Sequence, residues 1–165
     1  MPGTLHFVSG LPRTGSTLLM NLLGQNPGHF VTPTSGVVHM VRAVLENVSN
    51  CQEFKSQDMR LVQPRIDRAI AGLIDGYFAD AFGRKQVVFD KSRGWLEVIE
   101  PMERALGRPM RIITMVRDVR AIVASFEKLY QQRGLTFRRE GEPEGAMHNV
   151  YTRADMTLST EQVTG

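Results

Sequence analysis

The chain has 165 residues, 42% of them hydrophobic and 22% charged, with a formal net charge of +3, which fits one soluble domain with a hydrophobic core. Its lysines and arginines are scattered, and no window approaches the roughly 18 apolar residues that cross a bilayer, so the composition argues against nucleic acid and membrane as partners. Cys51 is the only cysteine, which excludes an intramolecular disulfide. The N-terminus also lacks the features of a signal peptide, and together these observations favour a cytoplasmic location.

Hydrophobic spacing predicts the elements of the first half of the chain. They are, in order, a strand over 5–9, a helix over 16–24, a loop or short extended piece over 30–36, and helices over 37–48 and 57–82. Ser16 or Thr17 is expected to cap the first helix, because a hydroxyl oxygen can accept a hydrogen bond from a free N–H group of the first turn.

The second half continues in the same manner. Its predicted elements are a strand over 86–89, a helix over 95–106, a strand over 111–116 and a helix from Asp118, as the cap, to about 132. The polar, glycine- and proline-containing stretch 138–149 is predicted as a loop or a poorly ordered tail, and 159–163 resembles the start of a helix that the chain does not finish.

Strands that alternate with helices in this way predict a three-layer α/β/α domain with a parallel sheet and right-handed crossovers. We expect the core of this domain to span 1–135. Residues 136–165 are expected to form an irregular tail that is flexible or completed by a partner chain.

The first strand is followed by an anion-binding motif, Gly10-Leu11-Pro12-Arg13-Thr14-Gly15-Ser16-Thr17. The pattern resembles a Walker A loop, except that Ser16 stands where that loop requires lysine. The backbone N–H groups of such a turn converge on one point, and the dipole of the following helix adds positive potential there. Gly15 permits the tight turn, and Arg13 adds a full positive charge. An ordinary strand-to-helix turn remains the alternative interpretation.

A second anion-binding signal follows the strand over 111–116. Arg117 stands at the end of this strand, where open α/β sheets gather ligand groups. Ser125 lies two helical turns beyond the cap Asp118 and on the same helix face. A guanidinium and a hydroxyl can hold one phosphate group between them. The alternative is that Arg117 pairs with a surface carboxylate and that Ser125 is a small packing residue.

Together the two motifs resemble the sulfotransferase family, which uses 3′-phosphoadenosine 5′-phosphosulfate (PAPS) as donor. The segment 12–19 is similar to the family's loop for the 5′-phosphosulfate, and 116–125 is similar to its 3′-phosphate motif. Within this family, the two motifs most resemble those of the tyrosylprotein-sulfotransferase-like branch, which includes many bacterial members. In that branch a strand end similar to Phe89-Asp90-Lys91-Ser92 carries a lysine near the transferring group. The resemblance covers about 5–130 and implies a P-loop-like fold.

The resemblance also implies roles for individual residues. The residues implied at the 5′-phosphosulfate are Pro12, Arg13, Thr14, Gly15, Ser16 and Thr17, and those at the 3′-phosphate are Arg117 and Ser125. Arg13 and Lys91 are the candidates for stabilising charge on the sulfuryl group as it moves to an acceptor hydroxyl or amine. The family binds this nucleotide without a required metal, in keeping with Ser16 in place of the Walker lysine.

Two features depart from the family pattern. The similar branch carries a glutamate base soon after the first helix, whereas 32–36 contains no carboxylate. His39, Glu46 and Asp90 are the nearby titratable groups, and we favour His39 because histidine ordinarily titrates near neutral pH. The chain also ends where relatives continue over the adenine, so we expect a shortened C-terminus. The alternatives are a truncated gene, a fragment, or a form that another chain completes, for example as a homodimer.

Two other functions stay open from the sequence. Because it lacks the glutamate of the similar branch and the segment that continues over the adenine, the chain could be a non-catalytic nucleotide-binding relic or assembly module. Alternatively, 87–90 could be a Walker B strand that places Asp90 on magnesium in a P-loop kinase or NTPase, although the missing lysine argues against this. The acceptor, a small molecule or a peptide, is not encoded in any motif that we recognise.

Overall fold

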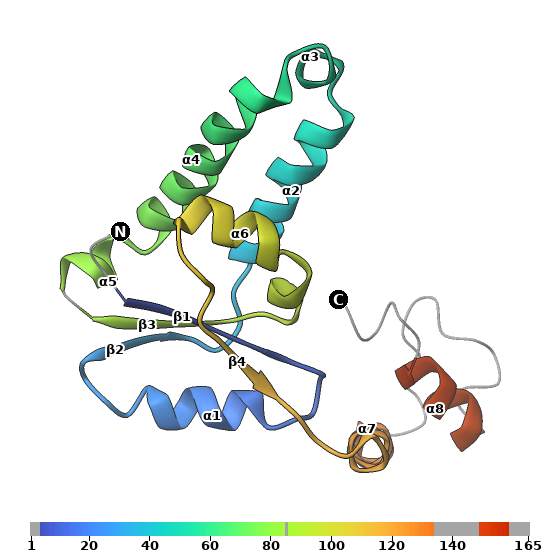
Figure 1. Ribbon diagram of the computed structural model, residues 1–165. Coiled ribbons are helices and arrows are strands. Elements are labelled where there is room, and N and C mark those ends of the chain that lie inside the picture. The colour runs from blue at the N-terminus through green and yellow to red at the C-terminus, as the bar shows by residue number, and fades with distance from the viewer. Residues whose placement is uncertain (1–3, 85, 134–148, 159–165) are drawn as a thin grey trace.

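The computed structural model describes residues 4–84, 86–133 and 149–158, and in these ranges a parallel sheet lies between helices (Figure 1). The sheet consists of β1 (Thr4–Gly10), β2 (His29–Thr32), β3 (Val87–Lys91) and β4 (Ile112–Met115), in the order β2-β3-β1-β4. All three pairings between neighbours are parallel. The predicted α/β/α class with a parallel sheet is therefore confirmed.

Parallel neighbours require crossovers, and helices supply them. The helices are α1 (Ser16–Leu23) after β1, then α2 (Val37–Asn50), α3 (Gln52–Lys55), α4 (Met59–Tyr77) and α5 (Ala79–Gly83) between β2 and β3, the 3₁₀ helix η1 (Arg93–Glu97) and α6 (Ile99–Leu106) before β4, and α7 (Val119–Arg133) and α8 (Val150–Leu158) after it. No helix in the described ranges is both long and apolar enough to span a bilayer.

The core has two parts, one on each face of the sheet. On the face covered by α2, α4 and α6 (Figure 1), a large cluster includes Phe7 of β1 and Trp95 of η1, whose ring centroids lie 4.6 Å apart. On the α1 face, Val8, Met20 and Phe89 form a smaller cluster. Alternate residues of β1 point to opposite faces, as the two-residue period of a strand requires, and this buries β1 on both sides.

Several details differ from the sequence-based expectations. The piece expected as loop or extended over 30–36 contributes a fourth strand, β2. The helix expected over 57–82 breaks at Phe78, and the one expected over 95–106 begins as a 3₁₀ helix. The short helix α3 was missed, and so was α8, which lies inside the segment 136–165 that we expected to be irregular. The expectations for 138–148 and 159–163 fall outside the described residues.

The cap of α1 is a further correction. The residue before this helix is Gly15, in the left-handed conformation at φ 91°, and no side chain caps the first turn. Ser16 and Thr17 instead lie within the helix, so the expectation that one of them is the cap is wrong. By contrast, Asp118 does cap the start of α7, where its Oδ1 accepts a hydrogen bond of 2.8 Å from the N–H of Arg120.

Gly10 sets the close approach between the ends of β1 and β4. It pairs with Met115 and has φ 140°. A Cβ added to Gly10 would lie 2.6 Å from the carbonyl oxygen of Met115. Because the first motif starts at Gly10 and the second starts directly after Met115, the absence of a side chain at Gly10 lets the two motifs lie side by side.

We therefore expect Gly10→Ala to lower the free energy of unfolding by about 2 kcal/mol or more, from the steric conflict together with the positive φ. Gly72→Ala in α4 is the matched control, since a Cβ there meets nothing within 4 Å, and alanine in a helix should stabilise it by about 0.5–1 kcal/mol. Urea unfolding of both variants measures the difference. Equal stability of the two variants would contradict the close packing at Gly10.

Candidate functional site

The loop between β1 and α1 is shaped by two residues in the left-handed region. Arg13 has φ 64° and Gly15 has φ 91°. Thr14 is buried, and its hydroxyl donates a 2.7 Å hydrogen bond to the carbonyl of Leu11, which holds the turn together from inside. The first turn of α1 presents N–H groups that have no partner within the helix, at the positive end of its dipole. The loop thus has the backbone geometry of an anion site.

A cavity of about 330 Å³ opens beside this loop, within the size range of small-molecule sites. It lies where the ends of β1, β2 and β3 come together. Its lining comprises Gly10, Leu11, Pro12, Arg13, Ser16, Thr17, Thr34, Ser35, His39, Lys91, Ser92, Arg93 and Gly94. We call it the loop cavity.

Lys91 brings a cation to the loop cavity from the end of β3. Its Nζ lies 3.4 Å from Oγ1 of Thr17, in the first turn of α1. Partial burial, and secondarily the positive charge of Arg93, lowers the pKa of the Lys91 ammonium below its ordinary value. The lysine that the resemblance singled out is therefore held against the anion loop, although Lys91 and Thr17 are far apart in the sequence.

His39 lies in the first turn of α2, is exposed to solvent and lines the loop cavity. Glu46 lies further along the same helix, is exposed and is not part of the lining. The described residues that line this cavity include no carboxylate. Of the three titratable groups considered from the sequence, His39 is the one that faces the cavity.

Asp90 lies in the protein interior and does not line the loop cavity. Its side chain is fully buried, and it accepts hydrogen bonds from Nε1 of Trp95 at 2.7 Å and from Oγ1 of Thr32 at 2.5 Å. Burial raises the pKa of the Asp90 carboxyl, against the opposing effect of the hydroxyl and indole donors around it. Since successive strand residues face opposite sides of a sheet, Asp90 points away from Lys91. This position argues against the magnesium-binding role of a Walker B aspartate.

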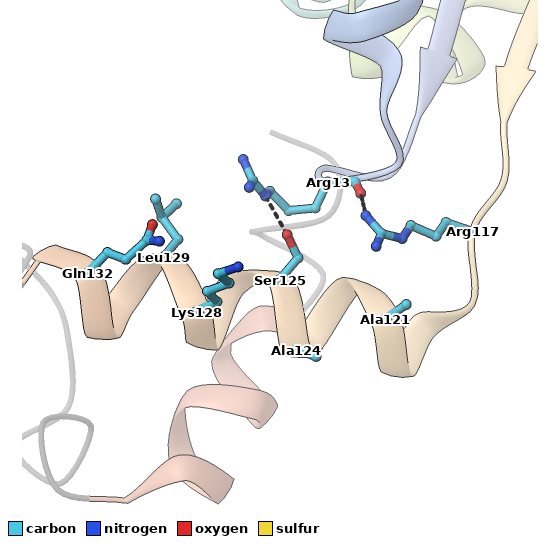
Figure 2. Close-up of a pocket in the computed structure, with 8 residues that line it drawn as sticks. All are labelled: Arg13, Arg117, Ala121, Ala124, Ser125, Lys128, Leu129 and Gln132. Atoms are coloured by element: carbon cyan, nitrogen blue, oxygen red, sulfur yellow. Dashed lines mark hydrogen bonds between the residues drawn. The ribbon is translucent and has the colours of Figure 1, made fainter.

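A second cavity, of about 520 Å³, lies between the loop and α7. Figure 2 shows the residues around it, which are Arg13, Arg117, Ala121, Ala124, Ser125, Lys128, Leu129 and Gln132. We call it the α7 cavity. Both residues of the second sequence motif belong to this lining, Arg117 from the connection between β4 and α7, and Ser125 from α7 itself.

Arg13 connects the two cavities. Its Nε donates a 3.0 Å hydrogen bond to Oγ of Ser125, and its carbonyl accepts one of 2.8 Å from Nη1 of Arg117 (Figure 2). The guanidinium of Arg13 therefore lies over α7, while its backbone belongs to the loop. The ends of β1 and β4 lie side by side, as the two-site interpretation of the sequence requires.

The structure gathers most of the sequence-predicted site residues. Pro12, Arg13, Ser16, Thr17, His39 and Lys91 line the loop cavity, and Arg13, Arg117 and Ser125 line the α7 cavity. Thr14 and Gly15 line neither, and they shape the loop from within. Lys128 and Gln132 were not predicted as site residues, although their spacing from Ser125 along α7 places them on the same helix face.

The model of a family described as the sulfotransferase family matches residues 6–162, a span that includes both cavities. No curated protein matches the chain.

Proposed function

The chain belongs to the sulfotransferase family, and we propose that it transfers a sulfuryl group from PAPS to an acceptor hydroxyl or amine. The observation that carries this proposal is the pair of cationic cavities joined at Arg13. A nucleotide with phosphate groups at both its 3′ and 5′ positions can place one in each cavity. A nucleotide with phosphates at the 5′ position alone would leave the α7 cavity without its anion.

In this arrangement the 5′-phosphosulfate binds at the loop, where the N–H groups of the first turn of α1, Ser16 and Thr17 surround it. The 3′-phosphate binds Arg117 and Ser125. Lys91 lies at the side of the loop cavity where the sulfuryl group is transferred, in keeping with the tyrosylprotein-sulfotransferase-like branch. Arg13 stands between the two groups, and its charge acts on both.

The reaction is an in-line displacement at sulfur. The acceptor oxygen or nitrogen forms a bond to sulfur while the bond from sulfur to the bridging phosphate oxygen breaks. The leaving group is adenosine 3′,5′-bisphosphate (3′,5′-ADP), and negative charge grows on the bridging oxygen. A fixed ammonium at Lys91 and the N–H groups of the loop stabilise that charge without rearranging. The acceptor proton goes to His39.

His39→Gln is expected to lower the turnover number about a hundredfold or more, because general-base catalysis contributes on this scale, while the affinity for 3′,5′-ADP stays unchanged. Glu46→Gln is the matched control on the same helix, outside the cavity, and should transfer at the wild-type rate. The measurement is transfer of labelled sulfate from PAPS to the best acceptor in a panel of phenols, sugars and peptides. Unchanged turnover in His39→Gln would remove His39 as the base.

One observation favours a second candidate function. Because the described lining of the loop cavity contains no carboxylate, no described residue there matches the glutamate base of the similar branch, and the second candidate is a domain that binds the nucleotide without transferring sulfate. The same acceptor panel separates the two functions. Labelled product supports the transferase, whereas tight binding of 3′,5′-ADP without product or sulfate release from PAPS supports a nucleotide-binding module.

A further inference from the structure

The face of α7 that lines the α7 cavity changes character along the helix. Ala121, Ser125, Lys128 and Gln132 recur every three or four residues, and all four line the cavity. The small side chains of Ala121 and Ser125 leave space near the end of β4, and Lys128 stands at the next turn. The helix therefore continues the phosphate motif with a cation one turn beyond Ser125.

The ammonium of Lys128 is directed into this space. Figure 2 shows its side chain turning back along α7 toward Ser125, on the side of the helix that faces Arg13. Lys128 is exposed, and it makes no hydrogen bond or ion pair with another residue in the described part of the chain. The lysine can thus reach an anion in the cavity without first giving up a protein partner.

The neighbouring carboxylates on α7 and at its cap are already paired elsewhere. Asp118 accepts a 2.7 Å hydrogen bond from Nη2 of Arg120, and Glu127 accepts hydrogen bonds of 2.7 and 2.6 Å from Nε and Nη2 of Arg153. These arginines hold the pKa values of both carboxyls below their ordinary values.

The described residues that line the α7 cavity include three cations, Arg13, Arg117 and Lys128, and no carboxylate. Among the described residues, no negative charge in the lining compensates the positive potential of these three cations. Such a cavity favours a small dianion over a singly charged or neutral group, because the attraction grows with ligand charge.

We propose that Lys128 is a third cation of the 3′-phosphate subsite and helps to select nucleotides that carry this phosphate. The inference rests on the proposed function. A phosphate monoester carries close to two negative charges at pH 7, and its three terminal oxygens can be shared among Arg13, Arg117 with Ser125, and Lys128. Each cation then meets the ligand group that distinguishes 3′,5′-ADP from 5′-ADP.

The test combines variants of Lys128 with the presence or absence of the 3′-phosphate. Calorimetry measures the binding of 3′,5′-ADP and of 5′-ADP to the wild-type chain, to Lys128→Met, to Lys128→Arg and to Lys55→Met, a control on α3. We expect Lys128→Met to weaken 3′,5′-ADP about tenfold, the scale of one charged hydrogen bond, with 5′-ADP within about twofold of wild type. Lys128→Arg should restore most of the affinity, and Lys55→Met should change neither.

The outcomes separate the inference from the function on which it rests. If the wild-type chain prefers 3′,5′-ADP and Lys128→Met keeps the full preference, the inference is overturned and the function stands. Equal weakening of both nucleotides by Lys128→Met also overturns it, since the lysine would then act on another part of the ligand. If the wild-type chain binds both nucleotides equally, the inference and the proposed function fall together.

Discussion

Lys91→Met is expected to slow sulfuryl transfer by about two to three orders of magnitude, the usual effect of removing one preorganised group that stabilises transition-state charge. Binding of 3′,5′-ADP should stay within about threefold of wild type, because this product lacks the sulfuryl group that Lys91 faces. The structural basis is the position of the ammonium beside Thr17, on the wall of the loop cavity. The rate at which PAPS releases sulfate by transfer to water measures the effect of this substitution, and it can be determined without knowing the acceptor.

The pH dependence of transfer tests the same residue independently. Burial, and then Arg93, lowers the pKa of Lys91, so the ammonium loses its proton at a lower pH than an ordinary lysine. The cationic form is present below that pKa, and transfer should therefore fall as pH rises through it. Lys91→Arg keeps its charge at every accessible pH and should move this alkaline limb upward. An identical alkaline limb in the two proteins would show that Lys91 is not the group that titrates.

Arg117→Met is expected to weaken 3′,5′-ADP binding about thirtyfold to a hundredfold, with a much smaller effect on 5′-ADP. A guanidinium that holds a phosphate through two charge-assisted hydrogen bonds contributes on this scale. Arg117 also donates to the carbonyl of Arg13, so part of the loss comes from a loop that is less well held. The binding of 5′-ADP reports that second part, because this nucleotide depends on the loop and lacks the 3′-phosphate.

Arg120→Met provides the control for the loss of an arginine from the same segment. The Arg120 side chain is 92% exposed and pairs with Asp118 rather than lining the α7 cavity. Its removal should leave the binding of both nucleotides near wild type. Should Arg117→Met and Arg120→Met weaken 3′,5′-ADP equally, general positive charge would explain binding and the specific role of Arg117 would be lost.

The sequence predicts the general fold well because the strands are short apolar runs and the long helices have strong hydrophobic periodicity. It predicts element ends less well where tertiary contacts decide them. The indole of Trp95 donates to the buried Asp90, and the segment that carries Trp95 is a 3₁₀ helix rather than the start of the predicted α-helix. β2 was predicted only as a loop or a short extended piece over 30–36, because the strand is four residues long and is followed by Pro33.

In the candidate site, too, local sequence patterns predict some features, whereas tertiary contacts decide others. The positions of Lys91, Arg117 and Ser125 follow from strand ends and helix spacing, and in the structure these residues line the two cavities. The direction of the Arg13 side chain depends on its left-handed backbone and on Ser125, more than a hundred residues away in the sequence. Such long-range contacts are not visible in local patterns. The roles of these residues, the acceptor and any partner chain stay predictions.

The most direct test of the account is a calorimetric comparison of 3′,5′-ADP, 5′-ADP and ATP, with the first two measured in the presence of a chelator and ATP measured with magnesium. Both phosphates of 3′,5′-ADP should be held at once, so this nucleotide should bind at least tenfold more tightly than 5′-ADP, without any metal. Binding of magnesium-ATP that exceeds that of 3′,5′-ADP, or equal binding of the two adenosine diphosphates, would contradict it.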